Sequence, residues 1–251
     1  MNRWIQTAYV LAAALLLACG QVLAACDDPP AEGVNWSGCD KAGADLSGAN
    51  LRGAILVRTR LAGARLSKAR MNGADFNFAD LSGADLSRAR LSDARMVGAN
   101  LSAAQLDGAR MNNTRLDRAT LDGASMEKTN LSNASLYKAT LADAKAPGAD
   151  LSEANLEQAN LTAIDLTGAQ LPKANLTRAL LEDAILIEAN MERINLDNAN
   201  LSFADLSRAN LERANLPEAR LVDTIVDGAQ LGNAIWVDRR RCRPGSVGEC
   251  R

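Results

Sequence analysis

The residue types that most often carry enzyme chemistry are scarce in this sequence. It contains no histidine, and no Gly-rich phosphate loop joins a strand to a helix. The many Asp residues do not follow the spacing of a calcium-binding loop. We therefore expect no catalytic residue, no cofactor-binding residue and no metal ligand, and the sequence predicts that the protein is not an enzyme.

Cysteine is the one reactive residue type with informative placement. Beyond Cys19, which lies in the N-terminal segment, the cysteines form an even set that flanks the central part of the chain: Cys26, Cys39, Cys242 and Cys250. An even set placed in this way is typical of disulfides in an exported protein. We predict two local disulfides, Cys26–Cys39 and Cys242–Cys250.

The N-terminal residues resemble a secretory signal. Arg3 precedes an apolar run from Ala8 to Ala18, and small residues follow. An apolar run of this length is too short to span a bilayer comfortably. We expect residues 1–24 to be a signal peptide, with cleavage after Ala24 and a periplasmic or secreted protein as the product.

Two other processing routes remain open. The residues before Cys19 and before Cys26 both resemble bacterial lipoprotein signals, in which the cysteine becomes the acylated N-terminus. Either route would tether the protein to a membrane, and we expect membrane contact only in that case. Acylation of Cys26 would leave Cys39 without its predicted partner.

The rest of the chain repeats every five residues. From Ala44 onward it divides into units of five without an insertion, and the frame extends back to Val34 and forward to Asp238. The third position is almost always Leu, and the first is mostly Ala. We therefore expect an N-terminal cap at residues 25–43, a repeat domain at residues 44–238 and a C-terminal cap at residues 239–251.

A period of five fits neither a helix nor a straight strand. On a helix, successive leucines would rotate by roughly 140° and scatter around the axis. On a strand with period two, they would alternate between opposite faces. A short extended piece followed by a turn at the last two positions satisfies the pattern, because positions one and three then both face inward. The sequence thus predicts an all-β coil with Leu and Ala inside.

Units such as Ala154-Asn155-Leu156-Glu157-Gln158 resemble the pentapeptide repeat family. The resemblance implies a right-handed quadrilateral β-helix with four units per coil. It would have about ten coils and stand on the order of 50 Å tall. The end coils of a solenoid expose unpaired backbone edges. We expect the two disulfides, with Trp36 and Trp236, to cap these ends.

Charge is unevenly distributed along the repeats. Residues 45–125 contain twelve Arg and Lys against eight Asp and Glu, whereas residues 126–234 contain nine against sixteen. With four units per coil, residues twenty apart would stack, so that two basic columns form a candidate interaction surface: Arg70, Arg90 and Arg110 in one, and Arg95 and Arg115 in the next. The alternative is a solvated face balanced by Asp75, Asp80 and Asp85.

Three further positions stand out. At Ala146-Pro147 a core Leu is replaced and the next residue has no amide hydrogen for a backbone ladder, which makes this site a candidate kink. The alternative is sequence drift that a redundant solenoid tolerates. Phe78 and Phe203 are expected to be exposed, where isolated aromatic residues usually have no role.

These features predict a non-catalytic extracytoplasmic protein that presents a charged rod to a protein or an envelope polymer. The net charge of −2 gives no electrostatic case for nucleic acid. The alternative comes from the resemblance alone, because some pentapeptide repeat proteins mimic DNA and bind type II topoisomerases such as gyrase. Those mimics use a strongly acidic surface in the cytoplasm, whereas this chain has a signal segment and a basic N-terminal half.

Overall fold

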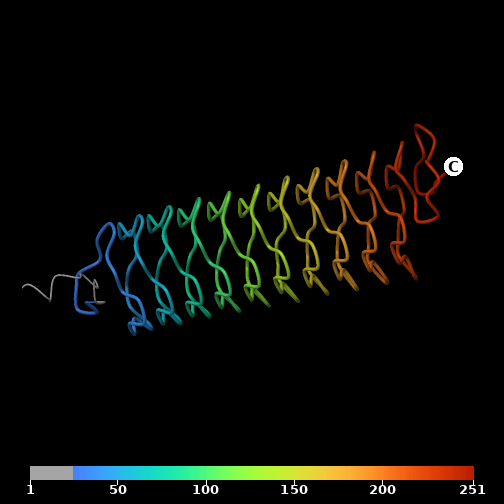
Figure 1. Ribbon diagram of the computed structural model, residues 1–251. Coiled ribbons are helices and arrows are strands. Elements are labelled where there is room, and N and C mark those ends of the chain that lie inside the picture. Colours follow the sequence, from blue (N-terminus) through green and yellow to red (C-terminus); the bar gives the residue numbers. More distant parts are fainter. Residues whose placement is uncertain (1–24) are drawn as a thin grey trace, which may run out of the picture.

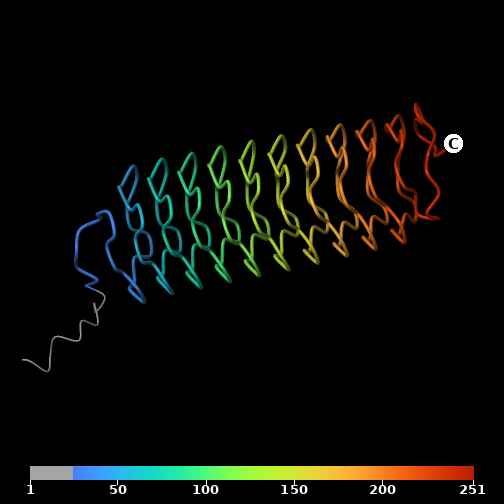
Figure 2. The same ribbon diagram turned by 45° about the horizontal axis from the view of Figure 1, so that its top comes forward.

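The computed structural model describes residues 25–251, which form an elongated stack of similar coils (Figure 1). The coils follow one another along the same axis when the molecule is turned (Figure 2). Within the described residues there is no helix, and the backbone pairs through isolated bridges rather than through continuous strands. The predicted signal peptide, residues 1–24, lies outside the described residues.

Each coil contains twenty residues. Parallel bridges pair every second-position residue with the residue twenty positions later, from Asn35 with Ile55 to Asn215 with Ile235. Four five-residue units therefore complete one turn, as the resemblance implied. We name the four sides of the coil by the units of one turn: side 1 contains residues 64–68, side 2 residues 69–73, side 3 residues 74–78 and side 4 residues 79–83.

The unit at residues 74–78 shows why the sequence winds in this way. Ala74 and Phe76, its first and third residues, are fully buried. Asp75 between them forms the bridge and points outward, and Asn77 and Phe78 make the turn. The prediction of two inward positions followed by a turn is confirmed. Because Ala and Leu supply almost all inward side chains, the core is a narrow column of aliphatic groups.

Backbone hydrogen bonds within and between the coils use four of the five amides of this unit. Ala74 N donates to Met71 O across the turn, Asp75 N to Ala54 O on the preceding coil, and Phe76 N and Phe78 N to Arg95 O and Val97 O on the following coil. The fourth-position amide, Asn77 N, donates instead to the Asp75 Oδ1 atom at 3.0 Å. The frequent Asp and Asn at the second position thus accept a hydrogen bond from the one backbone amide of the unit that takes no part in the ladder.

The fifth residue of the units has a positive φ, between about 50° and 70°, including Arg58, Phe78 and Phe203. Such a φ at the third residue of a four-residue turn is the type II pattern. It costs a non-Gly residue roughly 1 kcal/mol. The preference for Gly and Asn at turns therefore explains only some of the residues found at the fifth position. Arg, Lys, Glu and Phe are also accommodated there, because the ladder bonds on both neighbouring coils hold the turn in place.

The kink predicted at Ala146-Pro147 is absent from the described structure. Ala146 N donates to Asp165 O at 2.7 Å, and Pro147 O accepts from Lys128 N at 3.0 Å, so the ladder continues through this coil. The alternative reading, a departure that the repeat tolerates, agrees with the structure, because Pro147 is a fourth-position residue, whose amide takes no part in the ladder. Pro172 and Pro217 occupy the same position in their units.

Cross-linked segments close both ends. Cys26 is bonded to Cys39, and buried Trp36 beside them donates its indole N–H to Asp28 O at 3.2 Å. Cys242 is bonded to Cys250, and the segment pairs antiparallel with the last coil through Gln230 with Val247 and Ile235 with Arg241.

The C-terminal segment covers sides 2 and 3 of the last coil. On sides 4 and 1, the amides of Leu221 and Val226 have no hydrogen-bond partner within residues 25–251, and both side chains are only partly buried. One half of the last coil therefore keeps an open backbone edge.

Candidate interaction site

The arginine column, Arg70, Arg90 and Arg110, lies on side 2 of the rod. Each is the second residue of its unit, and parallel bridges join Arg70 to Arg90 and Arg90 to Arg110. Since the first and third residues of these units point into the core, the three arginines point outward, and all are exposed. Neighbouring bridged strands lie about 4.8 Å apart, so the guanidinium groups repeat at that step along the axis.

A second row of cations faces this column across the corner between sides 1 and 2. Lys68 and Arg88 are fifth-position turn residues with φ of 59° and 56°, and each lies two residues before an arginine of the column. Together with Arg70 and Arg90 of the column they line an open depression of about 420 Å³. We call this depression the basic groove.

None of the arginines of the column, nor Lys68 or Arg88, forms an ion pair with a carboxylate of the described chain. Asp85, the nearest acid in sequence to Arg88, accepts hydrogen bonds from Ser87 instead. Four cations therefore line one depression without an ion pair to an acid of the described chain, an arrangement that like-charge repulsion disfavours.

The second predicted column behaves differently. Arg95 and Arg115 are bridged on side 3, but each has an acidic neighbour. Arg95 Nε lies 3.8 Å from Asp75 Oδ2, and Arg115 Nε lies 3.9 Å from Asp117 Oδ2. The structure thus separates the five predicted arginines into an unpaired set on side 2 and a paired set on side 3.

The basic groove has definite ends. The column begins after Asn50 and stops before Asn130, which are bridged to Arg70 and Arg110. Beyond Arg88, a second depression of about 300 Å³ is lined by residues of both charges, including Asp107, Glu127 and Lys128. Lys128 Nζ lies 2.7 Å from Glu127 Oε1, and this hydrogen bond raises the pKa of Lys128. The stack of three second-position arginines without an ion pair is therefore limited to the coils of Arg70, Arg90 and Arg110.

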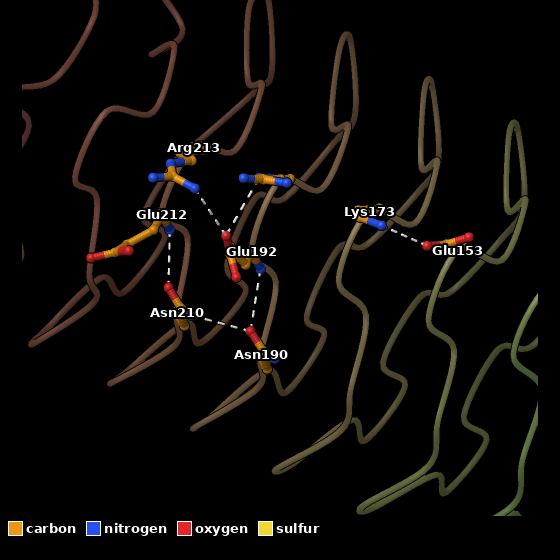
Figure 3. A network of polar contacts seen from close by, with 8 residues as sticks. Glu153, Lys173, Asn190, Glu192, Asn210, Glu212 and Arg213 are labelled. Carbon is orange, nitrogen blue, oxygen red and sulfur yellow. Dashed lines mark hydrogen bonds and ion pairs between the residues drawn. The ribbon is translucent and has the colours of Figure 1, made fainter.

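In the C-terminal half, stacked polar side chains satisfy one another. On side 2, Asn210 Nδ2 donates to Asn190 Oδ1 at 3.1 Å, where the N-terminal coils have stacked arginines (Figure 3). Lys173 Nζ lies 2.7 Å from Glu153 Oε1, and Arg213 reaches Glu192 at 3.6 Å (Figure 3). On side 3, an amide ladder connects successive coils through Asn155, Asn175, Asn195 and Asn215.

The two predicted aromatic residues are exposed, Phe78 at 55% and Phe203 at 49%. Phe78 lies on side 3, where Arg58 is 5.6 Å from its ring centre. Neither residue lines the basic groove. Within residues 25–251 no group of three or more His, Cys, Asp or Glu side chains is arranged to hold a metal ion. The same residues include no helix long and apolar enough to cross a membrane.

Sequence reasoning missed Lys68 and Arg88. The signal was present, because these residues also lie twenty apart and each precedes an arginine of the column by two residues. The sequence does not show that the turn of each side 1 unit forms the corner with side 2. In the structure, this corner brings the fifth residue of one unit and the second residue of the next unit to the same groove.

Comparison with known proteins agrees with this architecture. The family model for pentapeptide repeats matches overlapping stretches that together span residues 31–171 and 174–235. No curated protein matches the sequence.

Solved structures of several repeat proteins resemble the chain. HetL, a pentapeptide repeat protein involved in heterocyst differentiation regulation from the cyanobacterium Nostoc sp. strain PCC 7120, is 36% identical over 84% of this chain and 92% of its own, with a TM-score of 0.36. QnrB1, a plasmid-mediated fluoroquinolone resistance protein, is 21% identical over 69% of this chain and 90% of its own, with a TM-score of 0.47. A protein of the Arabidopsis thaliana thylakoid lumen is 35% identical over 41% of this chain and 71% of its own, with a TM-score of 0.40.

The family match covers most of the chain, and the twenty-residue register has the four-sided geometry of that family. The chain therefore belongs to the pentapeptide repeat family, whose members form right-handed quadrilateral β-helices.

Proposed function

We propose that this protein is a non-catalytic, extracytoplasmic structural and interaction protein, a rod of about ten coils that presents the basic groove to a partner. The observation that carries the proposal is the arginine column, whose three guanidinium groups have no acidic partner in the described chain. Other cations of residues 25–251, such as Arg52, Arg118 and Lys145, also lack an ion pair, but only this column stacks three second-position arginines without one on successive coils. An anionic partner would supply the opposite charges.

The rod holds the backbone positions of these arginines at a fixed spacing. The column residues stand between buried first and third positions, and their backbone amides bond to the preceding coil at 2.8 to 2.9 Å. Binding a partner would therefore not require the backbone to become ordered first. A pre-organised array loses less conformational entropy on binding than a flexible one.

Export is supported by two features of the chain. Residues 1–24 have the pattern of a signal peptide, and the following cysteines are joined as Cys26–Cys39 and Cys242–Cys250. Disulfides persist in oxidising compartments such as the periplasm. These features support the proposal that the rod lies outside the cytoplasm, either free or, after acylation at Cys19, tethered to a membrane.

The DNA-mimic alternative predicts binding to a type II topoisomerase through an acidic surface. The acidic excess lies in the C-terminal half, where several carboxylates are paired with cations, as Glu153 is with Lys173 and Glu188 with Arg208. Pairing reduces the negative potential that a DNA mimic needs. We favour the basic groove as the working surface for this reason.

Co-sedimentation with the envelope fraction of the native host tests the proposal. The purified mature protein is compared with the triple variant Arg70→Gln/Arg90→Gln/Arg110→Gln. The matched control is Arg193→Gln/Arg208→Gln/Arg213→Gln, which removes the same charge from arginines that are ion-paired. We expect the column variant alone to lose retention at low salt. Equal retention of all three proteins would contradict the proposal, and retention of purified gyrase by all three would support the alternative.

A further inference from the structure

The basic groove has the dimensions of a site for a linear polyanion. Its two rows of cations run along the rod axis, with the arginine column on side 2 and Lys68 with Arg88 across the corner. Cations within each row are separated by one coil, about 4.8 Å. A row of negative groups with a similar repeat would meet both rows at every step.

The lining excludes other modes of recognition. The four residues that form the groove are all cationic, and no aromatic side chain lines it. Bases of single-stranded nucleic acid are bound by stacking on aromatic side chains. Small-molecule sites are enclosed and mainly apolar, whereas this groove is open and charged. Recognition here must depend on the regular spacing of charge.

The spacing distinguishes between polymers. Phosphates along one strand of duplex DNA recur about every 3.4 Å of the helix axis, which is out of register with a step of about 4.8 Å. An extended polysaccharide advances by one sugar ring over a length comparable with one coil. If each sugar has a carboxylate, the chain presents about one carboxylate per coil. Successive sugars are rotated relative to one another, so the carboxylates are divided between the arginine column and the row of Lys68 and Arg88. The planar guanidinium fork binds carboxylate through two parallel hydrogen bonds.

We propose that the basic groove binds a short stretch of polyuronate, a linear polysaccharide with one carboxylate per sugar. This inference rests on the proposed function, because it assigns a chemical class to the partner of the same groove. Since the column ends at Asn50 and Asn130, the site takes about three to four sugars, one for each coil. Longer chains gain little, because they extend past Asp107 and Glu127.

The test is fluorescence anisotropy of the mature full-length chain with labelled oligogalacturonates of two to six sugars. The matched control ligand is the methyl-esterified oligomer, which keeps the sugar backbone and removes the charge. Affinity is expected to rise up to about four sugars and then to level off. The methyl ester is expected not to bind. Raising the salt from 50 to 500 mM should abolish binding, because exposed charges are then screened.

Three protein variants locate the site. Arg70→Gln/Arg90→Gln/Arg110→Gln is expected to bind oligogalacturonate about tenfold more weakly, the sum of about two exposed ion pairs. Lys68→Gln/Arg88→Gln is expected to bind more weakly for the same reason. Arg193→Gln/Arg208→Gln/Arg213→Gln should bind as the unaltered protein does. Far-ultraviolet circular dichroism confirms that each variant keeps its coils.

The outcomes separate this inference from the proposed function. Absence of oligogalacturonate binding, or equal binding by the column variant, overturns the polyuronate assignment. Tighter, column-dependent binding of polyphosphate or single-stranded DNA of equal charge also overturns it, yet leaves the groove as an interaction surface. If the column variant additionally keeps full retention by the host envelope, the proposed function itself is contradicted.

Discussion

Arg70 and Arg90 occupy equivalent positions on successive coils, joined by a parallel bridge, and neither guanidinium contacts a carboxylate of the described chain. Side chains that face each other across paired strands are close enough for like charges to repel. Two nearby arginines, Arg60 and Arg65, lie 3.2 Å from Asp40 and 3.5 Å from Asp45. The fold can therefore pair an exposed arginine with an acid one coil away, and it does not do so for Arg70 or Arg90.

Removal of the central charge of this column should stabilise the free protein. Arg90→Gln relieves repulsion from both neighbours and is expected to raise the free energy of unfolding by roughly 0.5 kcal/mol at low ionic strength. The gain should shrink in 1 M salt, because the charges are exposed and screened. Denaturant unfolding measures both values. Arg95→Gln is the control, since it removes the partner of Asp75. An equal gain in both variants would show that Arg90 is no more strained than a paired arginine.

The inward assignment of the third position is tested at Leu156, which is fully buried between the equivalent Leu136 and Leu176 of the adjacent coils. Leu156→Asp places a carboxylate in an aliphatic core and should unfold several coils, because an unpaired buried charge is far too costly to retain. Leu156→Met, which nearly conserves volume, should cost less than about 1.5 kcal/mol. Circular dichroism and thermal unfolding distinguish the two. A native spectrum for Leu156→Asp would contradict the assignment.

Both the positive φ of Gly98 and the nearby ring of Phe78 favour glycine at this position. An added Cβ at Gly98 would lie 2.8 Å from the ring of Phe78, one coil below, whereas an added Cβ at Gly83 meets nothing within 4 Å. Both glycines have φ near 60°, so the backbone cost of alanine is the same. Gly98→Ala should therefore destabilise the protein by about 1 kcal/mol more than Gly83→Ala, because the ring must leave its rotamer.

The double variant Phe78→Ala/Gly98→Ala separates these two costs. With the ring removed, the extra penalty at Gly98 should disappear, and the alanine there should cost what it costs at Gly83. Free energies of unfolding of the single and double variants give the coupling directly. A coupling of zero would mean that the exposed ring moves aside freely.

Processing and oxidation are tested by the intact mass of the protein from its native host. A chain that begins at Ala25 and gains four hydrogens on reduction would agree with cleavage after Ala24 and two disulfides. An acyl group at Cys19 would make the rod membrane-tethered. A chain that retains Met1 and has free thiols would contradict export and would favour the DNA-mimic alternative.

Much of the fold could be predicted from the sequence because the repeat is strict. A period of five excludes helix and straight strand, and it directs the first and third residues inward. The number of units per coil could not be derived in this way, since it depends on the angle of each turn. It was available only through the resemblance to the pentapeptide repeat family. Whether Pro147 bends the coil could not be decided from the sequence, because the five-residue period alone does not show which backbone amide takes no part in the ladder.

The candidate site was predicted less completely than the fold. Stacking at twenty residues placed Arg70, Arg90 and Arg110 in one column, and Arg95 with Arg115 in another. Which of these arginines form ion pairs depends on whether a carboxylate lies within reach of the guanidinium group. Counting the acids in the sequence does not show this. Asp75 was expected to balance the basic face as a whole, but it pairs with Arg95 alone.

The measurement that tests the basic groove most directly is arginine modification by phenylglyoxal, read by peptide mass spectrometry with and without the host envelope fraction. We predict that Arg70, Arg90 and Arg110 react readily in the free protein and become protected when the envelope fraction is present. Arg193, Arg208 and Arg213, which are paired with glutamates, should react equally in both states. Unchanged reactivity of the column, or protection of the paired arginines instead, would contradict the account.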